Sequence, residues 1–232
     1  MAQKKLFRFG EIKKFKNVLE YPNDIKNKWS EFFGNKNPIV LELACGRGEY
    51  TIGLSKLFPE KNFIGVDVKG NRMYLGAKTA LDQNLKNAAF LRTQIEMIDN
   101  YFGESEVDEI WITFPDPQLR LSKAKKRLTH PRFLRLYHKF LKPNGKINLK
   151  TDSPDLYNFT LDVINIYGFT IIENRDNLYS DLNINDSLKI KTHYEKMDIA
   201  RSERTHFLSF SLPHDIPEKD SELKTLLNEK AF

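Results

Sequence analysis

Apolar and polar positions between residues 38 and 212 follow two periods, those of strands and of helices. Short apolar runs predict buried strands, whereas apolar residues spaced three and four apart predict helices. Strands are predicted at 39–43, 62–67, 88–91, 107–114, 146–150, 169–173 and 205–212. Helices are predicted at 49–58, 71–85, 131–141 and 156–167, with a short one between 94 and 102. This alternation predicts an α/β fold with a mostly parallel sheet and helices on both faces.

The strand at 39–43 ends in a turn of small residues, and a helix follows at once. Glycine lets the backbone approach a ligand closely, and a helix N-terminus offers free N–H groups. Gly46 and Gly48 match two glycines of a dinucleotide site, but Thr51 stands at the third position. Glu42 lies inside the strand, where a carboxylate repels phosphate. The pattern therefore favours a cationic ligand such as S-adenosylmethionine over a pyrophosphate.

Polar residues close several of the other predicted strands. Ligands of open α/β sheets bind beyond the carboxyl ends of the strands, at the switch point of the topology. Asp67 closes the second strand and can accept both hydroxyls of a ribose; the alternative is a helix N-cap. Asp116 stands between Pro115 and Pro117, which fix the backbone around it. It is either an acid held rigidly at the site or the solvated cap of a structural turn.

Charge adds a candidate partner to this picture. The 232 residues contain 37 Lys and Arg against 31 Asp and Glu, a net charge of +6. From Pro117 to Thr151 there is no acid, whereas 11 residues are Lys or Arg. A solvated protein face usually mixes both signs, so this run indicates contact with nucleic acid. Such contacts hold phosphates and carry position rather than base identity. The alternative is a basic loop without a partner.

The remaining composition bounds the class of protein. A single cysteine, Cys45, and the lack of a long apolar run or signal-peptide core lead us to expect a protein of the reducing cytoplasm. No histidine shows metal-ligand spacing, so no metal is expected. We expect three parts: a basic arm at residues 1–37 that is either loosely ordered or touches phosphates, a domain with the predicted ligand site at residues 38–213, and an acidic, solvated tail at residues 214–232.

Several motifs together resemble the bacterial tRNA (guanine-N7)-methyltransferases. They are Glu42–Gly48, Gly65–Asp67, Phe114–Pro117, Lys125–Leu128, Lys150–Asp152 and Thr192–Glu195. The resemblance covers about residues 38–210. It implies a Rossmann-like class I methyltransferase fold, with a mostly parallel seven-stranded sheet and an antiparallel last strand. It further implies transfer of a methyl group from S-adenosylmethionine to the variable-loop guanine, position 46 of tRNA.

The resemblance also implies a role for each matching residue. Glu42, Gly46, Gly48, Asp67, Gln94 and Asp116 would bind the methyl donor, and Asp116 would be catalytic. Substrate guanosine would contact Arg120, Asp152, Thr192, His193, Tyr194 and Glu195. RNA would contact Ser122, Lys123, Ala124, Lys125, Lys126 and Arg127.

Four positions depart from the family pattern. Ala44 replaces the usual first glycine, which is tolerable if its φ is negative. Gln94 stands where an acid is common, so its contact with the adenine would be neutral. Gln118 replaces a tryptophan, and Arg120 replaces a lysine of different geometry.

Three other functions stay open at this point. The first is a methyltransferase that acts on another RNA or on protein, and the second is a nicotinamide-dependent oxidoreductase. The third is an RNA-binding module without activity. Retention of Glu42, Gly46, Gly48, Asp67 and Asp116 argues against the last of these. The sequence fits a monomer or a homodimer.

Overall fold

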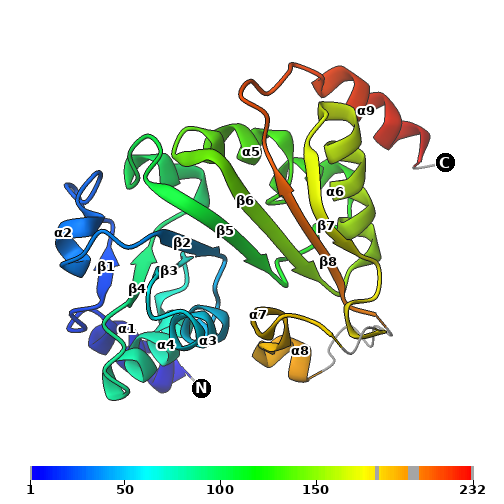
Figure 1. The fold of residues 1–232 in the computed structure, drawn as a ribbon. Coiled ribbons are helices and arrows are strands. Elements are labelled where there is room, and N and C mark those ends of the chain that lie inside the picture. Colours follow the sequence, from blue (N-terminus) through cyan, green and yellow to red (C-terminus); the bar gives the residue numbers. More distant parts are fainter. Residues whose placement is uncertain (1, 181–182, 198–203, 231–232) are drawn as a thin grey trace.

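The computed structural model describes residues 2–180, 183–197 and 204–230, which form one mixed sheet surrounded by helices (Figure 1). In the described chain this sheet has eight strands in the order β1-β4-β3-β2-β5-β6-β8-β7. The strands are β1 Val18–Glu20, β2 Ile39–Leu43, β3 Asn62–Asp67, β4 Ala88–Arg92, β5 Val107–Thr113, β6 Leu141–Thr151, β7 Thr170–Arg175 and β8 His206–Ser211. The first six strands pair in parallel, and β8 is antiparallel to both β6 and β7. The expected class I architecture with an antiparallel last strand is confirmed.

Helices cover both faces of the sheet. They are α1 Ala2–Ile12, α2 Trp29–Phe33, α3 Glu49–Leu57, α4 Gly70–Asp82, α5 Pro131–His138, α6 Pro154–Tyr167, α7 Asp186–Lys189, α8 His193–Lys196 and α9 Asp220–Glu229. Three short 3₁₀ helices join them: η1 Ile95–Asn100, η2 Leu121–Lys126 and η3 Leu178–Ser180. The main core packs α2, α5, α6 and α9 against one face, and two smaller clusters pack α1, α3, α4 and α7 against the other.

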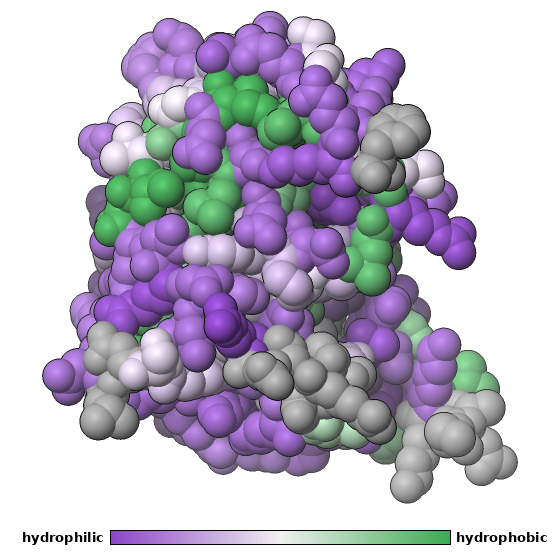
Figure 2. Space-filling model, turned by 90° about the vertical axis from the view of Figure 1, so that its right-hand side faces the viewer, coloured by the Kyte–Doolittle hydropathy of each residue, from purple (hydrophilic) through white to green (hydrophobic). Residues whose placement is uncertain are grey.

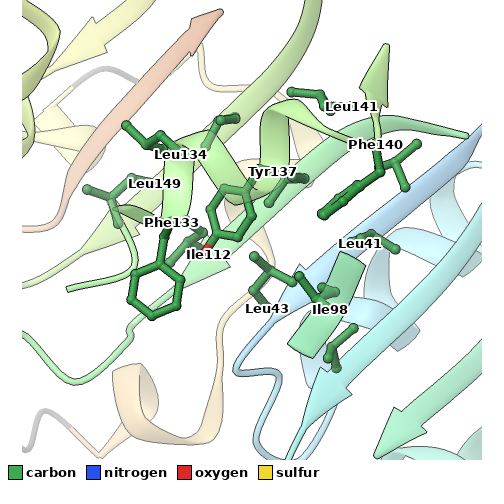
Figure 3. Packing of buried hydrophobic residues seen from close by; sticks show 14 of the residues in the cluster. Leu41, Leu43, Ile98, Ile112, Phe133, Leu134, Tyr137, Phe140, Leu141 and Leu149 are labelled. Atoms are coloured by element: carbon green, nitrogen blue, oxygen red, sulfur yellow. The ribbon is translucent and has the colours of Figure 1, made fainter. Parts of the chain in front are cut away.

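Alternation along the strands supplies both cores. In β2, Leu41 and Leu43 point into the main core, whereas Val40 points to the opposite face. Figure 3 shows the side chains of α5, among them Phe133 and Tyr137, lying over these strand residues. The β2 residues are all buried, because parallel strands covered on both faces expose neither side. The adjoining Glu42 therefore needs partners inside the protein.

The sheet order places the switch point between β2 and β5. From there β3 and β4 extend to one side and β6 to the other. The chain leaves the carboxyl ends of β2 and β5 at residues 44–48 and 114–119. These are the two turns that the sequence singled out, and the topology brings them together.

Residues 2–20 belong to the fold and do not form a loose arm. Ile12 of α1 is fully buried in a cluster with Met73 and Ala77 of α4. Phe15 stacks on Tyr74, with ring centroids 5.3 Å apart. The strand β1 then pairs in parallel with β4 and adds an eighth strand to the seven expected. Three residues give too short a pattern to predict a strand from sequence.

The expectation of a solvated tail is wrong for α9. Leu223 is 2% exposed and joins the main core. Asp220 at the start of the helix accepts hydrogen bonds from Tyr167 and from Arg135, whose Nη2 lies 2.6 Å from Oδ1. The ion pair with Arg135 lowers the pKa of Asp220. Asp220 and Glu218 thus form ion pairs with Arg135, whereas Asp215, Glu222 and Glu229 are exposed.

Figure 2 views the side that carries β7 and α9 and shows a mainly hydrophilic surface, with hydrophobic side chains gathered in its upper part. On the edge strand β7, Ile171 and Ile172 are 40% and 47% exposed. None of the helices in the described ranges has the length and apolarity to cross a bilayer. The same ranges contain no cluster of three or more His, Cys, Asp or Glu suited to a metal ion.

Leu223→Ala tests the docking of α9. The substitution empties a buried site, so we expect the free energy of unfolding to fall by about 2–3 kcal/mol. Thr225→Ala on the exposed side of the same helix is the matched control and should change it little. Urea denaturation measures both. Equal, small effects of the two substitutions would contradict the docked arrangement.

Candidate active site

A pocket of about 950 Å³ lies at the carboxyl ends of the central strands. Its walls come from the turns after β2 and β5, the ends of β3 and β4, the start of α6, and α8. The pocket brings together eight of the residues predicted from sequence: Gly46, Asp67, Gln94, Asp116, Lys126, Asp152, Thr192 and Tyr194. Their convergence fits the rule for ligand sites in open α/β sheets. Their individual roles stay predictions.

The turn after β2 is strained, because Ala44 does not have the negative φ that would make it tolerable there. Ala44 has a φ of 57°, as does Gly46, and Gly48 has a φ of 72°. A left-handed conformation costs an alanine roughly 1–2 kcal/mol. A Cβ on Gly48 would lie 2.5 Å from Cε1 of Phe90, so this glycine is also required for packing. Strain of this kind concentrates at functional sites.

Asp67 holds the same turn from the end of β3. Its Oδ2 accepts a hydrogen bond from the Gly46 N–H at 2.9 Å, and its Oδ1 accepts one from the Lys69 N–H at 2.8 Å. The side chain lines the pocket although the residue is only 8% exposed. A carboxylate has about four acceptor positions, so two hydrogen bonds leave capacity for ligand hydroxyls.

Glu42 lies behind the pocket and not in its lining. The carboxylate accepts hydrogen bonds from the Thr51 N–H at 2.7 Å, from the Thr51 hydroxyl, and from the Thr113 hydroxyl at 2.8 Å. Burial raises its pKa from 4.5 to about 7, against the opposing effect of these hydrogen bonds. Thr51 and Thr113 were missed from sequence, although both adjoin motifs: one in the first turn of α3, the other before Phe114.

Asp116 projects from a tightly held loop. Phe114 and Gln118 flank it with φ values of 47° and 49°. The Gln118 N–H donates to its Oδ1 at 3.1 Å. Asp116 is exposed and lines the pocket, where it could contact a ligand directly.

Arg127, which was expected to contact RNA, is turned inward and its donors are engaged by the protein itself. The residue is 6% exposed, and its guanidinium lies 4.5 Å from the centroid of the Phe159 ring. Nε donates to the Pro117 carbonyl at 3.2 Å, and Nη2 donates to the Gln118 carbonyl at 3.2 Å. A further hydrogen bond reaches the carbonyl of Leu119. Arg127 therefore fixes the loop that carries Asp116.

The rest of the basic run divides by exposure. Ser122, Lys123, Lys125 and Lys126 are exposed on η2, whereas Ala124 is 5% exposed and packs inward, away from an RNA contact. Arg120 is exposed but lies outside the pocket lining.

The segment expected to hold guanosine also divides. The Thr192 hydroxyl accepts from the Glu195 N–H at 3.2 Å, and the Glu195 carboxylate accepts from the Thr192 N–H at 3.4 Å, which forms a capping box on α8. Tyr194 lines the pocket under Arg72, and half-buried His193 packs edge-on against it. The Glu195 side chain is 7% exposed and forms an ion pair with Lys150 instead of lining the pocket.

Comparison with known proteins adds the family. Residues 36–207 match a family described as "putative methyltransferase". The tRNA (guanine-N(7)-)-methyltransferase of Bacteroides thetaiotaomicron is 45% identical over 97% of this chain and 92% of its own length. The enzyme of the same name from Porphyromonas gingivalis is 49% identical over 85% of each chain. The chain belongs to the tRNA (guanine-N7)-methyltransferase family. This membership decides the choice that the glycine pair left open in favour of methyl transfer.

Solved structures agree on the fold. The 16S rRNA methyltransferase KamB superposes with a TM-score of 0.61, at 14% identity, over 81% of this chain and 94% of that one. The 30S ribosomal A1408 methyltransferase from an uncultured bacterium has a TM-score of 0.57, at 16% identity, over 81% and 93%. At such low identity the likeness shows a class I methyltransferase fold and nothing about substrate.

Glu42→Gln tests the buried carboxylate through pH. Between pH 4.5 and about 7 the folded chain keeps a proton on Glu42 that the unfolded chain has released. The stabilising effect of the protonated Glu42 is therefore fully present below pH 4.5 and is lost as the pH rises through about 7. Over this range the free energy of unfolding should fall by on the order of 3 kcal/mol. Glutamine does not titrate, so the variant should gain stability relative to wild type from pH 5 to 8.

Urea denaturation at several pH values measures this difference. Glu60→Gln, at an exposed position, is the control and should follow wild type at every pH. A stability difference between Glu42→Gln and wild type that stays constant over this range would contradict the raised pKa.

Proposed function

We propose that this chain transfers a methyl group from S-adenosylmethionine to N7 of the guanine at position 46 of tRNA. The observation that carries the proposal is the joint placement of Asp67, Asp116 and Lys126 in one pocket. Asp67 is suited to bind the hydroxyls of a ribose, and Asp116 follows the strand end where we expect the chemistry. Lys126 adds a cation to the lining of the same pocket. The names of the relatives support methylation of guanine N7 in tRNA, and position 46 is our proposal.

The pocket residues fit this methyl donor. The turn at Gly46–Gly48 allows close approach of a ligand, and Asp67 would accept the ribose hydroxyls. Gln94 is exposed in the pocket, where its amide would meet the adenine. Glu42 would act on the donor through the turn it stabilises, since its oxygens face Thr51 and Thr113. A structural neighbour, the 16S rRNA (adenine(1408)-N(1))-methyltransferase, has been solved with this cosubstrate.

The chemistry required of the chain is modest. The donor supplies a methyl group on a sulfonium, which is an activated leaving group. Guanine N7 carries a free lone pair and needs no base to deprotonate it. The protein must align the reacting atoms and stabilise the positive charge that the base acquires. Asp116, held between two prolines at the pocket, would accept hydrogen bonds from the guanine N1–H and amino edge and favour that charge.

The tRNA would be held in two ways. Lys123, Lys125 and Lys126 present exposed charges on η2 for phosphates. An RNA base is read on its edges only when it is unstacked, so the guanine would swing into the pocket toward Asp152, Thr192 and Tyr194. Arg120, exposed beside the lining, would contact the same nucleoside from outside.

Incubation of unmodified tRNA with labelled methyl donor tests the function directly. We expect 7-methylguanosine after digestion to nucleosides, and none from tRNA in which guanine 46 is replaced by adenine. Label in another nucleoside, or only in another RNA, would support the alternative of a methyltransferase with a different RNA substrate.

Asp116→Ala should lower the single-turnover methylation rate on the order of 100-fold, because the positive charge on the guanine loses its partner. Binding of tRNA should change far less, since η2 is untouched. Filter binding and rapid-quench kinetics separate the two quantities. Asp82→Ala, at an exposed site on α4, is the control. A nearly normal single-turnover rate for Asp116→Ala would rule out the catalytic role.

Replacement of Lys123, Lys125 and Lys126 by glutamine should weaken tRNA binding and flatten its dependence on salt. The slope of log K against log salt should fall by roughly one for each lysine that contacts a phosphate. The charge-matched control replaces Lys36, Lys56 and Lys86, which are exposed outside the pocket lining. If both triple variants change the slope equally, η2 is not the RNA contact.

A further inference from the structure

Lys150 is a buried cation at the carboxyl end of β6. Its side chain is 0% exposed. The ammonium group donates to the carbonyls of Leu188 and Ile190, each at 2.9 Å, and to Oε2 of Glu195 at 3.2 Å. An ammonium group has three donors, and all three are used. The ammonium group of Lys150 is therefore fully hydrogen-bonded to other protein groups and has no donor left for solvent.

Three aromatic rings complete the surroundings of this charge. The ammonium nitrogen lies 5.5–5.6 Å from the ring centroids of Tyr50, Phe114 and Tyr179. The Tyr179 hydroxyl also donates to the other oxygen of Glu195. Burial lowers the pKa of Lys150 to about 8, and Glu195 opposes this shift. Glu195 thus has both oxygens occupied inside the protein.

The partners of Lys150 belong to the two sides of the pocket. The segment 186–197 contains Leu188, Ile190 and Glu195 and forms α7 and α8. In Figure 1 this segment lies just beyond the carboxyl ends of β5 and β6. On the other side, the Lys150 carbonyl accepts from the Phe114 N–H at 2.8 Å, two residues before Asp116. One residue therefore contacts both the Asp116 loop and the segment with Thr192 and Tyr194.

We propose that Lys150 is a positioning residue that fixes the segment 186–197 against the Asp116 loop, so that the guanosine side of the pocket is formed. The proposal rests on the proposed function. In this proposal Glu195 does not contact the guanine directly. Its carboxylate instead caps α8 and forms an ion pair with Lys150. Loss of Lys150 should therefore impair use of tRNA and leave the methyl-donor side, built by β2 and β3, intact.

Lys150→Met keeps the length and apolar stem of the side chain and removes its three donors. We expect kcat/KM for tRNA to fall at least 30-fold, while the Kd for S-adenosylmethionine, by calorimetry, stays within about threefold. Amide hydrogen exchange should rise in residues 186–196 and stay unchanged in β2 and β3. Lys146→Met, exposed on the same strand, is the matched control and should change none of these.

Glu195→Gln keeps the experiment decisive if Lys150→Met does not fold. It preserves the shape and removes one charge, so the same pattern with a smaller loss is expected. In a double-mutant cycle the two substitutions should be less than additive, because they remove one interaction.

Three results would overturn the proposal. They are normal kcat/KM for tRNA in both variants, unchanged exchange in residues 186–196, or equal loss of donor and tRNA binding in a folded variant. Failure of wild type to methylate tRNA would instead count against the proposed function, and the exchange and donor-binding measurements would still test Lys150.

Discussion

The pocket depends on a carboxylate buried in the centre of the sheet. Glu42 stands one residue before the end of β2, where both faces of the sheet are covered and the residue is 3% exposed. Burying an unpartnered carboxylate is costly, so its hydrogen bonds to Thr51 and Thr113 restrict the structure. These bonds connect the first turn of α3 to the end of β5. The two turns that leave the switch point therefore cannot move independently.

The first turn of α3 joins this carboxylate to a second buried polar unit. Thr51 contacts Glu42, and the adjacent Tyr50 lies against the Lys150 ammonium group. The Tyr50 hydroxyl also donates to the Ser187 carbonyl at 2.5 Å, just before the carbonyls that Lys150 holds. The two sides of the pocket, which we propose hold the methyl donor and the guanosine, thus meet on one helix turn, directly after the glycine turn. Placement of this helix sets both walls of the pocket.

The sequence was sufficient to predict those pocket residues whose place in the fold follows from their position at the end of a strand. Asp67 ends β3 and Asp116 follows β5, and the carboxyl ends of these strands lie at one edge of the sheet, so a correct order of elements brings the two acids together. The sequence was insufficient where tertiary packing determines the burial or the backbone conformation of a residue. Because residues 214–232 are rich in acids, the sequence predicted a solvated tail and not a helix with buried leucines. The positive φ of Ala44 belongs to a turn in which the Gly46 N–H donates to Asp67, a residue of another strand. Lys150 is the first residue of a recognised motif, but its three acceptors come from a segment 38–45 residues away, which the motif does not reveal.

The basic run shows that composition alone does not distinguish buried cations from exposed ones. Net charge treats Arg127 and Lys126 alike, yet one is buried and the other exposed. The planar guanidinium presents several donors in a fixed fork, which suits the consecutive carbonyls of residues 117–119; a lysine has no such fork. The inward arginine holds the loop from which Asp116 projects, and the outward lysines lie on the short helix between them. The exposed lysines of η2 and the proposed catalytic acid therefore belong to one segment held by Arg127, so phosphate contacts on η2, as we propose them, would also orient the base toward Asp116.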